Sequence, residues 1–412
     1  MGVYHLLLKT ITNFMLTIRR PLWLLILILI LAFGVRIAGA PAYTDAALQD
    51  DHKDYHVIAG NLVTGHDYVQ VAGFAYGRQP AWPYLLASVY LIGGVHTTVG
   101  AWLLALLGTL TVAVTWQVGY RIGTLIRRPR QNRLPVVMGV TAALIAALDP
   151  FLIAQDQALL AESFYTLGLM TFLFLLLRSE SRRTSAWLGA LLGLLTLIRS
   201  NGITFLLTLI LQRRRWLLIA IAVLIIVLIP WSLRNWVVIG SPTPLAPQMG
   251  QLILGCYNSF TINEPEAAGM WLYPRELPEG TPYNGLDYLA REQAWAQKGV
   301  EVIRANLSAV PRMMAQRVAR WLLQPVFISR PLLDPRLLAL QPPFYIFLLI
   351  ASLAGTVFLL MERRWRILWL CFSLLLPTAI TVALLYGEAR FRTPYHPLLA
   401  CLAAVVIGKL VR

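Results

Sequence analysis

Ten apolar runs, divided by short arginine-rich segments, restrict the fold of this chain more than any other feature. They cover residues 21–38, 99–119, 134–148, 159–177, 185–198, 202–211, 216–231, 344–361, 367–385 and 397–408. A helix needs about 20 apolar residues to cross a bilayer, and several runs are shorter than that. The sequence predicts an all-α polytopic membrane protein with about ten transmembrane helices. The fifth and sixth runs are the weakest, and a re-entrant hairpin turning at residues 199–202 is an alternative for them.

Composition excludes the main alternatives to a membrane protein. Apolar residues make up 58% of the chain and charged residues 13%, whereas soluble domains average about 45–50% and about 25%. The three cysteines show neither a disulfide framework nor a CxxC metal spacing. A soluble enzyme, a disulfide-rich secreted protein and a disordered chain are therefore excluded.

The positive charges indicate how the chain is oriented. Arginines cluster in alternate loops, at residues 127–133, 182–183, 213–215 and 363–366. By the positive-inside rule these loops and both termini face the cytoplasm. The segments assigned to the outside, which include the long loops 39–98 and 237–342, then hold 17 of the 19 acidic residues. We expect a multi-pass protein of the plasma membrane, the inner membrane in a bacterium, with its active site on the outer face.

The same sorting explains the net charge of +16. The excess lies in the loops assigned to the cytoplasm, so it is a topology signal. Nucleic acid is therefore not expected as a partner.

Three parts follow from this topology. Residues 1–236 form an N-terminal transmembrane module, whose first outer loop has a short juxtamembrane helix at residues 55–62. Residues 237–342 form a mostly helical outer, or periplasmic, segment, and residues 343–412 form the C-terminal transmembrane helices. In the outer segment, an amphipathic helix over residues 288–309 is interrupted at Pro311 and resumes over residues 312–323.

The first outer loop begins with four carboxylates in ten residues, at positions 45, 50, 51 and 54. Such a cluster can simply cap a helix N-terminus. At the boundary of a large apolar bundle, Asp51 or Asp54 can also serve as a general base or hold a metal ion. His52 and His56 are weak candidates for metal ligands, because their spacing is common.

Further charges are expected at the outer ends of the helices. They are Asp149, Asp156, Glu162, Arg199, Arg234, Glu388, Arg390 and Arg392. Each of them alone is compatible with snorkelling or a structural ion pair. Ionisable groups near bilayer depth are costly and therefore functional candidates. Acids and arginines on one face of one bundle are typical of a site for an anionic headgroup with a carboxylate beside it.

Four stretches, in this order, resemble motifs of the GT-C glycosyltransferases, a superfamily that includes protein O-mannosyltransferases and lipid A aminoarabinose transferases. They are DHKDY from Asp51 with RQP from Arg78; LLAES around Glu162; LTLIR ending at Arg199 with PWSLRN around Arg234; and GEARFRTP from residue 387. The resemblance covers residues 20–405. Two positions depart from the family pattern, because His52 stands where the family has Glu and Gln79 where it has a first Pro.

The resemblance implies transfer of a sugar, a hexose or a pentose, from a polyprenyl-phosphate donor to a lipid, glycan or protein acceptor. Asp51 (by family position) or Asp54 (by its place next to Tyr55) would take the proton of the acceptor hydroxyl, with inversion at the anomeric carbon. The donor phosphate would be bound by Arg234, Arg390 and Arg392. The other site candidates are Tyr55, Arg78, Asp156, Glu162 and Arg199. Some members of the family use a divalent cation and others do not.

Three alternatives remain open at this point. A polysaccharide polymerase or ligase also uses lipid-linked glycans. A transporter or flippase for a lipid-linked sugar would typically show inverted repeats and broken helices at the midplane, and the sequence shows no such symmetry. The third is a non-catalytic assembly protein.

Overall fold

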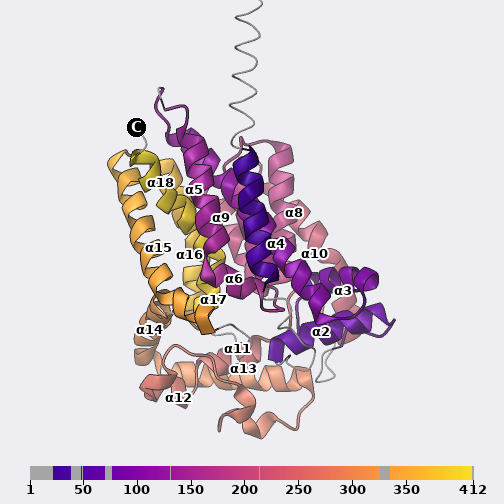
Figure 1. Cartoon of the computed structure of the whole chain (residues 1–412). Coiled ribbons are helices and arrows are strands. Elements are labelled where there is room, and N and C mark those ends of the chain that lie inside the picture. Colours follow the sequence, from indigo (N-terminus) through magenta and orange to yellow (C-terminus); the bar gives the residue numbers. More distant parts are fainter. Residues whose placement is uncertain are drawn as a thin grey trace, which may run out of the picture.

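The structure is a computed structural model, and it describes residues 22–38, 48, 50–69, 77–129, 131–212, 214–324 and 335–410. Within these ranges every regular element is a helix (Figure 1). The predicted all-α class is therefore confirmed.

Five helical segments of the described chain are long and apolar enough to cross a membrane. They are α4 (Thr97–Ile126), α10 (Leu217–Ile239), α15 (Pro335–Met361), α16 (Trp365–Leu384) and the segment Ala389–Leu410, which contains α17 (Ala389–Arg392) and α18 (His396–Leu410). A sixth arises if α5 (Leu134–Leu148) and α6 (Pro150–Asp156) are counted together, although a bend of 57° separates them. The protein is thus a multi-pass membrane protein. Five or six of the ten predicted runs meet this length test.

The remaining runs form shorter helices within the same bundle. They are Leu22–Ile37, α7 (Glu162–Leu176), α8 (Arg182–Ile198) and α9 (Leu206–Leu211). After α8 the chain turns at Arg199 into a 3-10 helix, η3 (Ser200–Phe205), which leads into α9. The fifth and sixth runs therefore form two helical arms that meet at Arg199.

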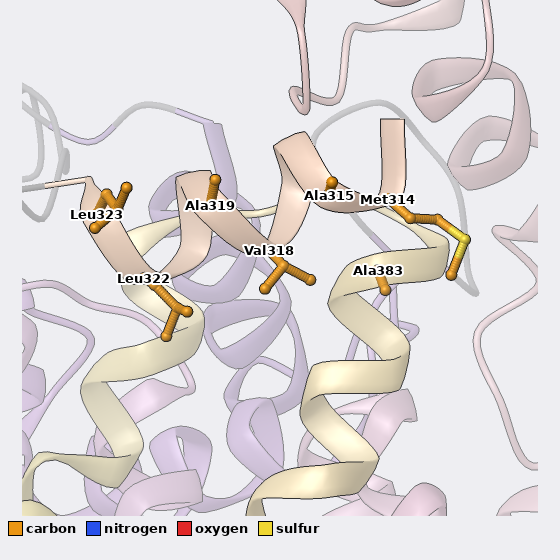
Figure 2. Close-up of a pocket in the computed structure, with 7 residues that line it drawn as sticks. All are labelled: Met314, Ala315, Val318, Ala319, Leu322, Leu323 and Ala383. Carbon is orange, nitrogen blue, oxygen red and sulfur yellow. The ribbon is translucent and has the colours of Figure 1, made fainter. Parts of the chain in front are cut away.

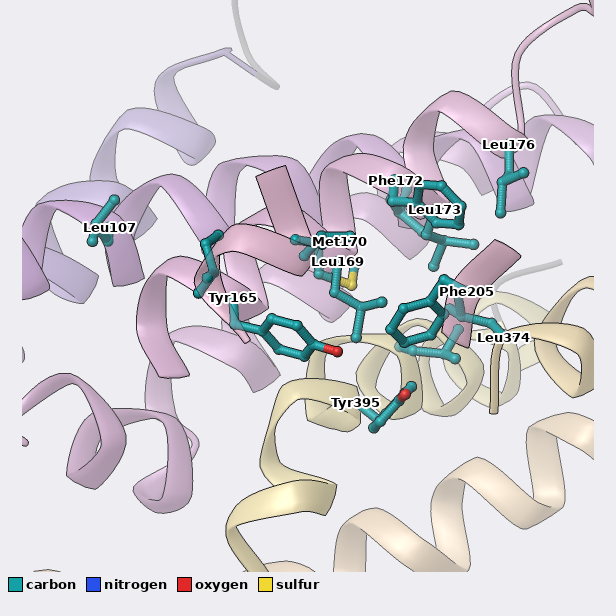
Figure 3. Packing of buried hydrophobic residues seen from close by; sticks show 14 of the residues in the cluster. Leu107, Tyr165, Leu169, Met170, Phe172, Leu173, Leu176, Phe205, Leu374 and Tyr395 are labelled. Atoms are coloured by element: carbon teal, nitrogen blue, oxygen red, sulfur yellow. The ribbon is translucent and has the colours of Figure 1, made fainter. Parts of the chain in front are cut away.

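Helix α7 lies in the middle of the apolar core (Figure 3). Its side chains pack against residues of α4, η3, α16 and η8 (Thr393–Tyr395), among them Leu107, Phe205, Leu374 and Tyr395. Helices α10 and α15 are mostly unburied in their apolar windows, with exposed Ile226 and Ile350. A membrane helix exposes such side chains where lipid replaces water as the solvent.

Glycines allow two helix pairs to approach closely. A Cβ at Gly189 of α8 would lie 2.1 Å from the carbonyl oxygen of Ala220 in α10, and one at Gly355 of α15 would lie 1.9 Å from that of Leu402 in α18. Only glycine fits at such contacts, which are common where membrane helices pack.

Two groups of helices cover the end of the bundle that carries α17 (Figure 1). The first is the pair α2 (Asp50–Val63) and α3 (Ala81–Gly93) from the first predicted outer loop. The second, from the predicted outer segment, contains α11 (Met249–Cys256), α12 (Ser259–Asn263), α13 (Tyr288–Ala305) and α14 (Val310–Leu323).

Two details of these helices differ from the sequence prediction. Helix α2 is longer than residues 55–62. Pro311 does not interrupt a helix; it lies in the first turn of α14, where the missing N–H costs nothing.

Buried and half-buried arginines donate hydrogen bonds to the C-terminal carbonyls of other helices. The guanidinium of Arg36 donates to the carbonyl of Ala147 at the end of α5 (3.2 Å), and that of Arg364 to the carbonyl of Ile126 at the end of α4 (2.8 Å). In the same way, Arg214 donates to a carbonyl at the end of α7, Arg317 to one at the end of α16 and Arg392 to one at the end of α14. The last four carbonyls of a helix have no partner within it, and lipid offers none. A cation there also opposes the negative end of the helix dipole.

Candidate active site

Asp51 and Asp54 lie one helical turn apart on α2, so they share a face of the helix. Arg78, in the loop before α3, binds both of them. Its Nη2 lies 2.5 Å from Asp51 Oδ1 and 2.7 Å from Asp54 Oδ2, and its Nε lies 3.1 Å from Asp54 Oδ2. One guanidinium therefore fixes both candidate bases.

A second arginine reaches Asp51 from the far end of the chain. Arg390 of α17 places Nη1 3.6 Å from Asp51 Oδ2 and Nε 2.9 Å from Glu388 Oε2. Asp51 thus lies between two guanidinium groups, one on each of its oxygens. Its side chain retains 34% exposure, so solvent can reach it.

A third ion pair lies beside these two. Glu162, the first residue of α7, is bonded to Arg199, which follows α8. The guanidinium carbon of Arg199 lies 5.4 Å from the ring centre of Phe391, and that of Arg390 is equally far from the same ring. Phe391 therefore contacts two like-charged guanidinium groups, each with its own carboxylate.

The electrostatics keep Asp51 ionised. Burial raises the pKa of its carboxyl, but the charges of Arg78 and Arg390 outweigh that effect and hold the pKa well below its usual range. Burial raises the pKa of the neighbouring Tyr55 hydroxyl to about 12. Asp51 is thus a carboxylate at any physiological pH, whereas Tyr55 stays neutral and can act only as a hydrogen-bond donor or acceptor.

The charges of this cluster nearly cancel. Four carboxylates (Asp51, Asp54, Glu162 and Glu388) face three guanidinium groups (Arg78, Arg199 and Arg390). An incoming phosphate must therefore compete with a carboxylate for an arginine.

The loop that carries Arg78 is anchored on three sides. Tyr68 Oη donates to the carbonyl oxygens of Arg78 and Gln79, each at 3.2 Å. Gln79 Nε2 donates to Ser200 Oγ at 2.7 Å, and Gln248 of the outer segment donates to the carbonyl of Gly77. Gln79, which departs from the family pattern, thus makes a bond to η3 that a proline cannot make.

Arg234 lies on the other side of Tyr68. Its guanidinium carbon is 5.4 Å from the ring centre of Tyr68 and 4.7 Å from that of Trp231, and its Nη1 donates to Asn235 Oδ1 at 3.1 Å. In the part of the chain that the structure describes, Arg234 pairs with no carboxylate. Of the three predicted phosphate-binding arginines, it is the one without a carboxylate or backbone-carbonyl partner there.

Two predicted site residues lie outside the cluster. Arg392 is buried, donates to the carbonyls of Trp321 (2.7 Å) and Gln324 (2.6 Å), and lies over the Tyr345 ring. Asp156 forms a buried pair with Arg36 at 2.6 Å. Both bind structural partners in the bundle.

The histidine candidates do not assemble a metal centre. His56 Nδ1 is hydrogen-bonded to Tyr90 Oη at 2.8 Å. Among the described residues, no three His, Cys, Asp or Glu side chains are arranged to hold a metal ion. The two carboxylates best placed for a cation, Asp51 and Asp54, are already bound to Arg78. The described residues therefore offer no preformed set of ligands for a metal ion.

An apolar groove of about 500 Å³ lies between α14 and the end of α16 (Figure 2). It is lined by Met314, Ala315, Val318, Ala319, Leu322, Leu323 and Ala383. The α16 end of the groove is close to the loop that carries Glu388 and Arg390, because Ala383 precedes that loop by a few residues.

Three residues of the site were not among the predicted functional candidates. Glu388 was expected among the charges at the outer helix ends, although without a role of its own. Gln79, Ser200 and Phe391 act through hydrogen bonding and shape, and the sequence gives no signal that separates them from other loop residues.

No model of a known protein family matches the chain, and no curated protein matches it. Among solved structures, the chain is similar to an oligosaccharyltransferase from Archaeoglobus fulgidus in complex with zinc and sulfate, with a TM-score of 0.48 and 14% identity over 94% of this chain and 49% of that one. It is also similar to ArnT from Cupriavidus metallidurans bound to undecaprenyl phosphate, with a TM-score of 0.43 and 14% identity over 94% of this chain and 78% of that one. For the apo state of the same ArnT, the TM-score is 0.40 and the identity 15%, over 93% and 77%. The chain thus spans about half the length of the oligosaccharyltransferase.

Proposed function

We propose that the protein is a membrane glycosyltransferase that moves a sugar from a polyprenyl-phosphate donor to an acceptor hydroxyl on the outer face of the membrane. One observation carries the proposal, namely that Asp51 is held between Arg78 and Arg390. These residues come from the first and the last of the four motif stretches, which are far apart in the sequence. Transfer from a lipid phosphate needs a carboxylate to accept a proton and guanidinium groups to bind the phosphate. Both kinds of group lie here at the end of an apolar bundle.

The reaction follows from these groups. The acceptor oxygen attacks the anomeric carbon as the bond from that carbon to the phosphate oxygen breaks. The hydroxyl proton goes to a carboxylate, and the lipid phosphate leaves with the bonding electrons. The transition state has oxocarbenium character, and one displacement inverts the anomeric configuration.

Arg390 and Arg234 are the proposed phosphate-binding residues, because guanidinium groups bind phosphate oxygens with two hydrogen bonds. Arg392 is left out, since both of its terminal nitrogens donate to backbone carbonyls in the bundle. A phosphate bound by Arg390 neutralises the positive charge that acts on Asp51, so the pKa of Asp51 then rises toward its ordinary value. Donor binding would thereby turn a firmly ionised carboxylate into a better proton acceptor.

Asp51 is the proposed base, and Asp54 holds Arg78 in place for it. The alternative assignment reverses these roles, because Oδ1 of Asp54 accepts no hydrogen bond from a described residue. The apolar groove between α14 and α16 is the proposed binding site of the prenyl chain, because its lining is apolar and includes Ala383, which stands a few residues before Arg390.

The test uses the full chain in liposomes, with polyprenyl-phosphate sugars and envelope acceptors from cells that lack the protein. Mass spectrometry follows the free polyprenyl phosphate, which every transfer releases whatever the acceptor. We expect Asp51→Asn to lower its release by about 100- to 10,000-fold, the usual contribution of a general base. The matched control is Asp67→Asn, an exposed acid of the same loop.

Each outcome decides one point. Full activity of Asp51→Asn with loss in Asp54→Asn would move the base to Asp54. Full activity of both would show that neither is the base. Transport of an intact donor without release of polyprenyl phosphate would make the protein a transporter.

A further inference from the structure

A small polar cavity lies at the end of the bundle opposite the charged site. Its volume is about 150 Å³, several times the roughly 30 Å³ that one water occupies in the liquid. The ends of α4, α7 and α9 and the start of α16 surround it. Helix α7 begins at Glu162 in the active site and ends at Leu176 in the wall of the cavity, and its 15 residues span roughly 20 Å. The cavity is thus separate from the active site.

Two arginines face this cavity with little acid to balance them. Arg214 donates to the carbonyl of Leu176 at 2.8 Å, whereas Arg366 forms no ion pair or hydrogen bond with any residue that the structure describes. A single acid is found in the described lining, Glu180, and it accepts a hydrogen bond from the backbone N–H of Arg215. The described lining thus carries one more positive charge than negative.

The two guanidinium groups are close enough to act on each other. Burial lowers the pKa of Arg214, Glu180 opposes that shift, and the positive charge of Arg366 lowers the pKa further. An anion between Arg214 and Arg366 would relieve this repulsion. Arginine's planar fork suits phosphate oxygens, which it binds in pairs of hydrogen bonds.

Gln212, whose Nε2 donates to Ser373 Oγ at 2.7 Å, also lines the cavity, which lies at the level of lipid headgroups. Five aliphatic side chains complete the wall, namely Leu125, Leu176, Leu177, Ile367 and Leu370. Arg366 lies in the first turn of α16, and Trp365 and Trp369 of the same turn and the next are exposed. Exposed tryptophans near the end of a membrane helix mark the interface between hydrocarbon and water.

We propose that this cavity binds the phosphate of an anionic membrane lipid, with Arg366 and Arg214 as its ligands and the lipid chain along the apolar wall. In the orientation expected from the basic loops, this lipid belongs to the cytoplasmic leaflet, where anionic headgroups attract basic residues. Free phosphate shares the chemistry of the headgroup but would leave the apolar wall unused. The site is independent of sugar transfer.

The test is a lipid titration of the full-length protein in neutral detergent, followed by thermal unfolding. Phosphatidylglycerol should raise Tm at lower concentration than phosphatidylcholine, which has the same phosphate but no net charge. Arg366→Gln should require at least ten times more phosphatidylglycerol for the same shift. Arg183→Gln removes an exposed arginine from the same face and does not line the cavity, so it should behave like the wild type.

Native mass spectrometry of the purified protein gives a second readout that needs no added lipid. The wild type and Arg183→Gln should retain one anionic phospholipid more than Arg366→Gln. Equal retention and equal shifts in all three proteins would overturn the site. A full shift with inorganic phosphate alone, at the concentration that works for the lipid, would support the anion site and overturn the lipid as its source.

Discussion

Asp51 and Arg390 come from opposite ends of the chain, yet Asp51 Oδ2 and Arg390 Nη1 lie 3.6 Å apart. The contact closes the charged site, because Arg78 already holds the other oxygen of Asp51. Arg390 also belongs to the segment that leads into α18. The position of the last membrane helix therefore bears directly on the charge of the proposed base.

Arg390→Gln should change the pH dependence of transfer as well as its rate. Removing one of the two cations that hold the pKa of Asp51 down lets that pKa rise toward about 3.9. The variant should therefore lose relative activity at a higher pH than the wild type as the medium is acidified. The measurement is kcat/KM from pH 3 to pH 7 in both proteins.

The control for this profile is Arg304→Gln, which removes an exposed arginine of α13. Its profile should coincide with that of the wild type. An acidic limb that stays in place in Arg390→Gln would show that Arg390 does not set the pKa of Asp51.

Arg78→Lys should lower activity while leaving the acidic limb near its wild-type position. The ammonium keeps the positive charge but cannot reproduce the forked contact with Asp51 and Asp54. Loss of one charged hydrogen bond costs about 1.5–3 kcal/mol, which corresponds to roughly 10- to 100-fold in rate. Steady-state kinetics of Arg78→Lys beside Arg390→Gln separates the effect of geometry from that of charge. A wild-type rate in Arg78→Lys would show that charge alone matters at this position.

Asp156→Ala should destabilise the bundle strongly, because it leaves Arg36 buried without its carboxylate. Breaking a buried ion pair at one partner typically costs about 3–5 kcal/mol, whereas replacing both partners by apolar residues is often close to neutral. The double variant Arg36→Met, Asp156→Leu should therefore unfold at a higher temperature than Asp156→Ala. Thermal unfolding in detergent gives the unfolding temperatures of the wild type and the two variants. An Asp156→Ala protein as stable as the wild type would contradict the structural role given to this pair.

Glu292 should make stability fall as the pH rises. Burial raises the pKa of its carboxyl to about 7 from an ordinary value of 4.5, although backbone N–H groups of Gln251 and Gly250 oppose the shift. The folded state then binds the proton more tightly than the unfolded state. This stabilisation is fully present below about pH 4.5 and is lost as the pH rises through 7.

Glu292→Gln keeps an acceptor for the Gln251 N–H and removes the titration. Its Tm should vary less between pH 5 and pH 8 and should exceed that of the wild type at pH 8. Glu266→Gln, at an exposed position, should follow the wild type. An unchanged slope in Glu292→Gln would exclude Glu292 as its source.

Sequence patterns predicted the all-α membrane class and placed the main charged residues of the site on one face. The runs of apolar residues predict the all-α class, because a chain segment in lipid must satisfy its backbone hydrogen bonds internally, as a helix does. The acidic start of the first loop and the arginines before the last helix predict where the charged residues of the site gather. The number of spans was not predictable in the same way, since Asp149 caps α6 and the chain bends by 57° there, directly after the apolar run 134–148.

The different fates of Arg390 and Arg392 were not predictable either. The two stand in the same motif, but residues two positions apart in a helix point to nearly opposite sides. Arg390 meets the carboxylate of Asp51, and Arg392 meets the carbonyls at the end of α14. Which side faces the site depends on how the short α17 packs, and no local sequence signal encodes that.

The arginines that satisfy helix ends impose an order on the maturation of this protein in the membrane. The end of α4 receives its donor from Arg364, and the end of α14 from Arg392, long after each helix has left the ribosome. Until those residues are synthesised, the carbonyls must find water or lipid headgroups. The ends of α4 and α14 therefore gain these partners only once the last quarter of the chain is made, so the bundle cannot close helix by helix during synthesis. A chain truncated before residue 364 should remain a loose set of inserted helices, open to proteolysis at the ends that those arginines would have covered.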